Sequence, residues 1–198
     1  MKRMIITGFE PFGGESINPS WEIVKALPDV VGDYELTKRC IPVVFGGAAE
    51  LVLERAGEIQ PDVILSIGQA GGRSAITPEK VAINLRHASI PDNMGNKPTD
   101  EPIIPGGETA YFSTLPVRRM TEAISASGVS AQLSYTMGTY VCNDLTYILL
   151  SHFCDGGTQV GFIHVPYCTE QGKEPSMEIN TMIEAIKIAI ENIKNEES

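Results

Sequence analysis

The sequence has no long apolar run, which limits where the protein is expected to reside. The first apolar stretch, residues 4–6, ends at Thr7 and Gly8. A secretory signal needs roughly 7–15 apolar residues at such a position. No later stretch approaches the roughly 20 apolar residues that cross a bilayer. We therefore expect a cytoplasmic protein with no membrane partner.

Positive charge is also scarce. The 15 lysines and arginines stand against 25 acidic residues, which gives a formal net charge of −10 at pH 7. An acidic surface repels phosphate backbones, so the composition argues against a nucleic-acid partner. Apolar residues make up 42% of the chain and charged residues 20%. Disorder needs low hydrophobicity and high charge, so a folded protein is expected instead.

Cysteine is too sparse and too irregularly spaced for a disulfide framework. Cys40, Cys142, Cys154 and Cys168 match no zinc motif either, so free thiols in a reducing compartment are expected. A zinc site built from the pairs 152/154 and 164/168 would need a strand at the first pair and a helix at the second. The sequence predicts the reverse order.

Strand-like and helix-like segments alternate along the chain. Strands are predicted over 3–6, 34–44, 63–67, 131–136 and 160–165. Helices are predicted from Pro19 with Asn18 or Ser20 as cap, and over 48–59, 117–127, 141–153 and 176–195. Such alternation indicates one α/β domain, residues 1–198, with helices on both faces of a sheet. Residues 68–114 are rich in Gly, Pro, Asn and Asp, which predicts loops and short hairpins around one site.

Cys142 follows a glycine-containing loop and precedes a helical pattern, so its sulfur is expected in the first turn of a helix. The positive end of the helix dipole favours the thiolate. Lowering an ordinary thiol pKa by about two units takes roughly 2.7 kcal/mol, whereas a helix end supplies roughly 0.3–2 kcal/mol. A nearby imidazole would have to supply the rest. The alternative is a buried thiol that fills core space.

His164 closes an apolar strand, and catalytic groups of open α/β sheets gather at the carboxyl ends of strands. The alternative is a hydrogen-bonded core histidine. A cysteine–histidine pair needs a third group to orient the ring. The sequence does not choose among the acidic candidates in the loop-rich region: Glu79, Asp92, Asp100, Glu101 and Glu108. Glu79 starts an apolar run, which is a position from which it would face a cleft.

Two glycine-rich turns follow strands. Residues 8–14 fit neither common phosphate-binding pattern, but carry Phe9 and Phe12, which are suited to line an apolar pocket for a flat ring or to anchor the loop to the core. Residues 68–73 contain Gln69, and backbone N–H groups there are placed to face an oxyanion or a ligand carbonyl.

Six segments together resemble the pyroglutamyl peptidase I family along almost the whole chain: ITGFEPFGG (6–14), NPSW (18–21), GQAGGR (68–73), IPDN (90–93), GTYVCN (138–143) and GFIHVPY (161–167). The resemblance implies an α/β/α sandwich with a mostly parallel or mixed sheet, and a cytosolic homotetramer. It implies a Cys–His–Glu triad of Cys142, His164 and Glu79, with no metal or cofactor. The implied substrates are peptides with an N-terminal pyroglutamate, bound against Phe9, Phe12, Val141 and backbone groups near Gln69.

One departure from the family pattern concerns Ser89, which stands where the family usually has an arginine before IPDN. Arg86 and Arg73 are the candidates to replace that charge, although a strand period of two would aim Arg86 to the opposite face. A second departure is the acid Glu108 after Pro105-Gly106-Gly107. The departure at Ser89 keeps two alternatives open: a thiol amidase with another substrate, and a binding module without activity.

Overall fold

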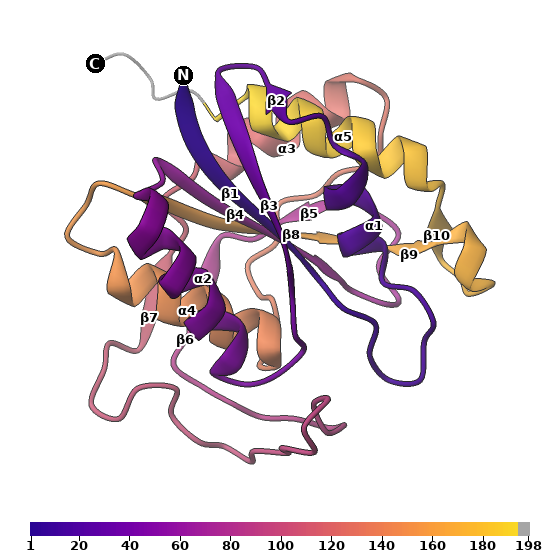
Figure 1. Cartoon of the computed structure of the whole chain (residues 1–198). Helices are drawn as coiled ribbons and strands as arrows, with labels where there is room; N and C mark the ends of the chain where they lie inside the picture. Colours follow the sequence, from indigo (N-terminus) through magenta and orange to yellow (C-terminus); the bar gives the residue numbers. More distant parts are fainter. Residues whose placement is uncertain (194–198) are drawn as a thin grey trace.

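The computed structural model describes residues 1–193 and is built around a mixed sheet with the strand order β2-β3-β1-β4-β8-β5 (Figure 1). Its strands are β1 (Lys2–Phe9), β2 (Val30–Val31), β3 (Tyr34–Ile41), β4 (Val63–Gln69), β5 (Thr77–Pro78) and β8 (Gln159–Val165). Strands β3, β1, β4 and β8 are parallel, whereas β2 and β5 run antiparallel at the two edges. The expectation of a mostly parallel or mixed sheet is confirmed.

Helices cover both faces of this sheet, which confirms the expected α/β/α sandwich (Figure 1). The helices are α1 (Pro19–Ala26), α2 (Gly47–Ile59), α3 (Val117–Ala126), α4 (Val141–His152) and α5 (Ile179–Glu191). Helices α1, α3 and α5 contribute to one hydrophobic core, and α2 and α4 contribute to the other. Within residues 1–193, none of the helices combines the length and the apolar character that crossing a bilayer requires.

Strict alternation along the central strands divides their side chains between the two cores. In β1, Met4 and Ile6 join the core under α1 and α5, whereas Ile5 packs under α2 and α4. In β8, Phe162 belongs to the α2/α4 side. Because side chains repeat every two residues in a strand, His164 lies on that same side.

The predicted helices agree with the structure except at the last one. Asn18 is the cap of α1, because its side-chain oxygen accepts a hydrogen bond from Ser20 N at 3.1 Å. The helix predicted over 176–195 begins only at Ile179, since β10 (Ser176–Met177) pairs with β9 (Tyr167–Cys168) first. Positions 194 and 195 of that prediction lie outside the described residues.

The strand predicted over 131–136 is wrong, and Pro78 provides the physical reason. The segment runs beside residues 76–80, where Gln132 N donates to Ile76 O at 2.9 Å and Ser134 N donates to Pro78 O at 3.0 Å. A continuous parallel ladder would also need an N–H at position 78 to reach Gln132 O, and proline has none. Two isolated bridges remain in place of a strand.

The loop-rich region 68–114 contains the expected loops, but its paired strands do not form a short hairpin. Strands β6 (Val81–Ile83) and β7 (Ala110–Phe112) pair antiparallel and are joined by the long connection 84–109. A 3₁₀ turn, η1 (Thr169–Gln171), follows β9 near the carboxyl end of the main sheet.

Gly8 should be intolerant of a side chain because α1 crosses β1 there at backbone distance. A Cβ on Gly8 would lie 2.5 Å from Ser20 O and 2.6 Å from Trp21 Cα. We expect Gly8→Ala to lower the free energy of unfolding by about 1–3 kcal/mol. Gly57→Ala is the matched control: this position lies in α2 with open space around it, so the change should stabilise by about 0.5–1 kcal/mol.

Urea unfolding of both variants measures the two effects. Equal stabilities for Gly8→Ala and the unchanged protein would contradict the close packing of α1 on β1.

Candidate active site

The edge strand β5 brings Glu79 beside His164. Thr77 of β5 pairs with His164 of β8, and Glu79 N donates to Phe162 O at 2.9 Å. His164 Nδ1 then donates to Glu79 Oε1 at 2.7 Å. Both side chains are buried, with 4% and 0% exposed. Because the proton sits on Nδ1, the other ring nitrogen Nε2 is left as a base.

Cys142 is the second residue of α4, as the sequence predicts, and it lies against the end of β4. A Cβ placed on Gly68 would be 3.1 Å from Cys142 Sγ. Gly68 pairs with His164 in the β4–β8 register. The thiol therefore lies on the side of the sheet that carries His164 and Glu79, at the carboxyl ends of the parallel strands.

Asn143 fixes the first turn of α4, next to Cys142. Its side-chain oxygen accepts from Ile83 N at 2.9 Å, and its amide donates to Ile83 O and Leu85 O, both at 2.9 Å. The side chain is completely buried. These bonds tie α4 to β6, so the position of the thiol depends on the β6–β7 pair as well as on the main sheet.

Burial dominates the ionisation of the pair. Desolvation raises the pKa of the Cys142 thiol to about 12, with a further rise from the charge of Glu79 and a smaller opposing effect of Arg73 and of its own backbone N–H. Desolvation also lowers the pKa of His164, although its bond to Glu79 opposes this. Burial therefore favours the neutral forms of both groups in the ligand-free protein.

Burial thus opposes the thiolate that the position of Cys142 at a helix start favours. The helix end acts in the expected direction, because the backbone N–H of Cys142 lowers the pKa. The loss of water around the sulfur has the larger effect. A neutral thiol beside a neutral imidazole is suited to attack a carbonyl with transfer of its proton to His164 in the same step.

Phe9 and Phe12 lie on the same side of the sheet as the thiol. Phe9 is only 2% exposed and packs on Phe162, with ring centroids 6.4 Å apart. Phe12 is partly buried, and its ring centroid lies 6.3 Å from that of Tyr140. Phe45 meets Tyr140 edge-on at 5.4 Å. An aromatic wall of Phe12, Tyr140 and Phe45 therefore stands beside the start of α4.

The other two expected binding residues also lie near Cys142. Val141 is the first residue of α4 and is completely buried. Gln69 ends β4, directly after Gly68, and its side-chain oxygen accepts from Gln171 Nε2 at 2.9 Å. Sequence reasoning did not single out Tyr140 or Gln171; the GTYVCN motif contains the first, whereas no local pattern marks the second.

The two arginines considered as substitutes for the charge missing at Ser89 are both engaged with carboxylates. Arg86 pairs with Asp144, and Arg73 pairs with Glu79 at 2.5 Å. Ser89 is exposed in the loop after β6.

The remaining acidic candidates serve the loops. Asp92 accepts from Phe45 N at 3.0 Å and from Asn96 N at 2.8 Å, and Asp100 pairs with His87. The acceptor of the hydrogen bond from His164 Nδ1 is Glu79. It is none of the four other candidates, which are Asp92, Asp100, Glu101 and Glu108. The four cysteines are free thiols. In the part of the chain described, no three His, Cys, Asp or Glu side chains gather as a metal site would require.

A half-buried thiol at a helix start, an imidazole at a strand end and a buried carboxylate behind it are the arrangement of a cysteine peptidase. Comparison with known proteins specifies the group further. The profile of the family described as Pyroglutamyl peptidase matches residues 2–196. The chain belongs to this family.

Individual relatives agree over their full lengths. The chain is 47% identical to a pyrrolidone-carboxylate peptidase of Yersinia pseudotuberculosis, over 96% of this chain and 92% of the relative. It is 44% identical in sequence to pyroglutamyl peptidase I from Bacillus amyloliquefaciens. The crystal structure of that protein matches with a TM-score of 0.93 over 98% of this chain and 97% of the relative. The pyrrolidone carboxyl peptidase of Thermococcus litoralis is 38% identical to the chain, and its structure matches with a TM-score of 0.93 over 98% of this chain and 93% of the relative. These matches do not favour the alternatives raised by Ser89.

Gly68 should be essential for the position of the thiol. A Cβ there would lie 2.6 Å from the Phe162 ring and 3.1 Å from Cys142 Sγ. We expect Gly68→Ala to lower kcat/KM by about 100-fold, because displacement of a reacting atom by a fraction of an ångström to an ångström has effects of this size.

Gly161→Ala separates this effect from simple overpacking. Its Cβ would lie 2.5 Å from Leu115 Cδ1, on the opposite face of the sheet. Both variants should lose stability, but only Gly68→Ala should lose activity per folded molecule. Equal activities of the two variants would contradict the contact between Gly68 and the thiol.

Proposed function

We propose that the chain hydrolyses the amide bond after an N-terminal pyroglutamyl residue, with Cys142 as nucleophile, His164 as general base and Glu79 as the group that orients the imidazole. The observation that carries the proposal is the buried hydrogen bond from His164 Nδ1 to Glu79 Oε1, formed on the face of the sheet where α4 presents Cys142. Family membership supports the same reaction.

The neutral pair that burial favours defines the order of proton transfers. Cys142 Sγ attacks the pyroglutamyl carbonyl carbon while His164 Nε2 takes the thiol proton. The imidazolium so formed is stabilised by Glu79, and gives its proton to the leaving amine as the C–N bond breaks. A water molecule, deprotonated by His164, then attacks the thioester and releases pyroglutamate and the free thiol.

The proposed binding residues suit a neutral five-membered lactam. Phe12 supplies part of the aromatic wall, while Phe9 and Val141 support the site from the core. Backbone groups next to Gln69 are proposed to pair with the lactam N–H and C=O. A charged N-terminal amine would lose its hydration there without compensation, which disfavours ordinary peptides.

Other properties of the proposed enzyme rest on the family resemblance. They are a single peptidase domain over residues 1–198, a homotetrameric assembly, a cytoplasmic location and activity without metal or cofactor. The net charge of −10 supports the absence of a nucleic-acid partner.

Release of a fluorescent amine from a pyroglutamyl amide tests the reaction and the nucleophile together. We expect rapid release by the unchanged protein and a loss of more than about 1,000-fold in Cys142→Ala, because the covalent route is then closed. The matching prolyl amide, which carries a charged amine, is the substrate control. Release that persists in Cys142→Ala, or faster cleavage of the prolyl amide, would sink the proposal.

The acid limb of the pH profile should report His164. The base must be neutral, and burial lowers its pKa from the usual value of about 6.5. Activity should therefore persist at mildly acidic pH and fall only as the pH drops through that lowered pKa. Glu79→Gln removes the carboxylate that raises this pKa, so the acid limb should move to still lower pH while kcat falls by about 10²–10⁴. An acid limb that moves to higher pH in Glu79→Gln would contradict the assignment.

A further inference from the structure

We infer that Arg73 is a positioning residue of the catalytic triad, whose guanidinium holds Glu79 in place against His164. The inference rests on the proposed function, because it assigns a role through Glu79 and His164 rather than contact with the substrate. No local sequence pattern assigns this role, because Arg73 lies in the loop between β4 and β5 whereas Glu79 comes after β5.

One oxygen of Glu79 carries both of its interactions. Glu79 Oε1 accepts from His164 Nδ1 at 2.7 Å and from Arg73 Nη1 at 2.5 Å. The other oxygen, Oε2, is buried and has no hydrogen-bond partner in residues 1–193. A carboxylate fixed through one atom needs a second donor there to keep its direction, and Arg73 is that donor.

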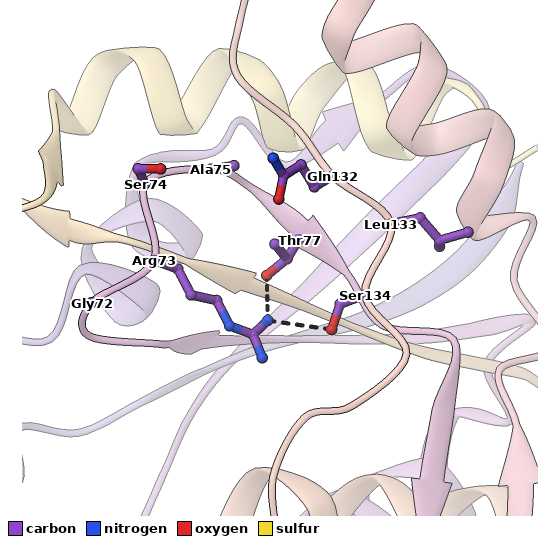
Figure 2. A pocket seen from close by; sticks show the side chains of 8 residues that line it. All are labelled: Gly72, Arg73, Ser74, Ala75, Thr77, Gln132, Leu133 and Ser134. Carbon is purple, nitrogen blue, oxygen red and sulfur yellow. Dashed lines mark hydrogen bonds between the residues drawn. The ribbon is translucent and has the colours of Figure 1, made fainter.

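Arg73 is itself held in a defined geometry, which an ordinary surface arginine lacks. Its Nη1 donates to Thr77 Oγ1 at 2.7 Å and lies 3.5 Å from Ser134 Oγ. Figure 2 marks both interactions with dashed lines. Its Nη2 donates to Thr136 O at 2.8 Å. The acceptors come from β5 and from the segment that runs beside it. The guanidinium therefore connects the sheet edge to the triad.

Arg73 also separates Glu79 from solvent. The arginine side chain is 29% exposed, whereas Glu79 is 0% exposed. Arg73 lines an open pocket of about 380 Å³ together with its hydrogen-bond partners Thr77 and Ser134. Figure 2 shows the side chains around this pocket. Without the guanidinium, a buried carboxylate would be left next to this pocket without its cation.

The positive charge of Arg73 shifts the pKa values of Cys142 and His164 in a direction that can be measured. Glu79 and Arg73 are the charged groups that act on both reacting residues, with Glu79 directly after β5 and Arg73 on the loop before it. Glu79 raises the pKa values of Cys142 and His164, and Arg73 lowers both. Loss of Arg73 should therefore shift both titrations to higher pH, which is opposite to the shift expected for Glu79→Gln.

The test uses Arg73→Gln, Arg73→Lys and a control, Arg118→Gln, which removes the same charge from the exposed part of α3. Arg73→Gln should lower kcat more than it raises KM, by about 10–100-fold, and should move the acid limb of kcat/KM upward by about one pH unit. In Arg73→Lys, the acid limb should lie close to its position in the unchanged protein, because an ammonium group keeps the positive charge. The variant should recover less of kcat, because it loses the planar fork of the guanidinium. Arg118→Gln should leave both unchanged.

Chemical rescue provides a second measurement on folded protein. Arg73→Ala leaves space that opens to the pocket, so guanidinium chloride at about 10–50 mM, below denaturing concentrations, should raise its kcat several-fold. Sodium chloride at the same ionic strength should not, and Arg118→Ala should not respond to either salt. Near-ultraviolet circular dichroism before and after addition shows whether the fold is retained.

Alkylation of Cys142 by iodoacetamide gives a readout that does not depend on the substrate. Its rate at a fixed pH of about 8 should be lower in Arg73→Gln than in the unchanged protein, because a smaller fraction of the thiol is ionised. Arg73→Gln with an unshifted acid limb, an unchanged alkylation rate and kcat within twofold of the unchanged protein would overturn the inference, as would a lack of rescue by guanidinium in folded Arg73→Ala. Failure of the proposed function would look different: the unchanged protein itself would not cleave the pyroglutamyl amide.

Discussion

The buried carboxylate of Glu79 is the constraint on which the rest of the site depends. An ionised carboxylate without contact to water is costly unless donors surround it. Glu79 has two, His164 and Arg73, and both meet the same oxygen. The antiparallel edge strand β5 positions this residue. Its pairing with β8 puts Thr77 opposite His164, so that Glu79, two residues later, lies beside the imidazole ring.

The rest of the geometry follows from the two-residue period of the strands. On the side of the sheet covered by α2 and α4, β4 presents Ile64, Ser66 and Gly68, and β8 presents Val160, Phe162 and His164. Gly68 is the one position among these six without a side chain. The missing Cβ is what allows α4 to place Cys142 against β4. A parallel sheet with helices on both faces therefore supplies the base, and a glycine on the neighbouring strand supplies the space for the nucleophile.

Local sequence patterns were sufficient to place Cys142 at the start of a helix and His164 near the end of an apolar strand, because both features are visible in a single segment. Glu79 was not separable from the other acids without the family resemblance, since its partner lies 85 positions away and its burial is a property of the fold. The pairing of Arg73 with Glu79 was missed for the same reason, and Arg73 was considered only as a substitute for the charge absent at Ser89.

The strand expected over 131–136 does not form because Pro78, its neighbour in space, has no N–H to donate. The sequence of the segment itself does not contain this information. The ionisation of Cys142 likewise depends on its surroundings in space. A helix dipole can be inferred from sequence, whereas the amount of water lost around a sulfur cannot, and here the second effect is larger.

The same loss of water connects the resting state of the site to its proposed substrate. A site that favours the neutral forms of both Cys142 and His164 is a site where any isolated charge is unfavourable. Pyroglutamate presents a neutral lactam in place of the ammonium group of an ordinary N-terminus, so it can enter without that cost. The charges that the reaction does require appear only during attack, when the imidazolium forms beside Glu79. Glu79 and Arg73 form an ion pair that exists before the substrate arrives, so the site has its electrostatic support in place without a free charge facing the ligand.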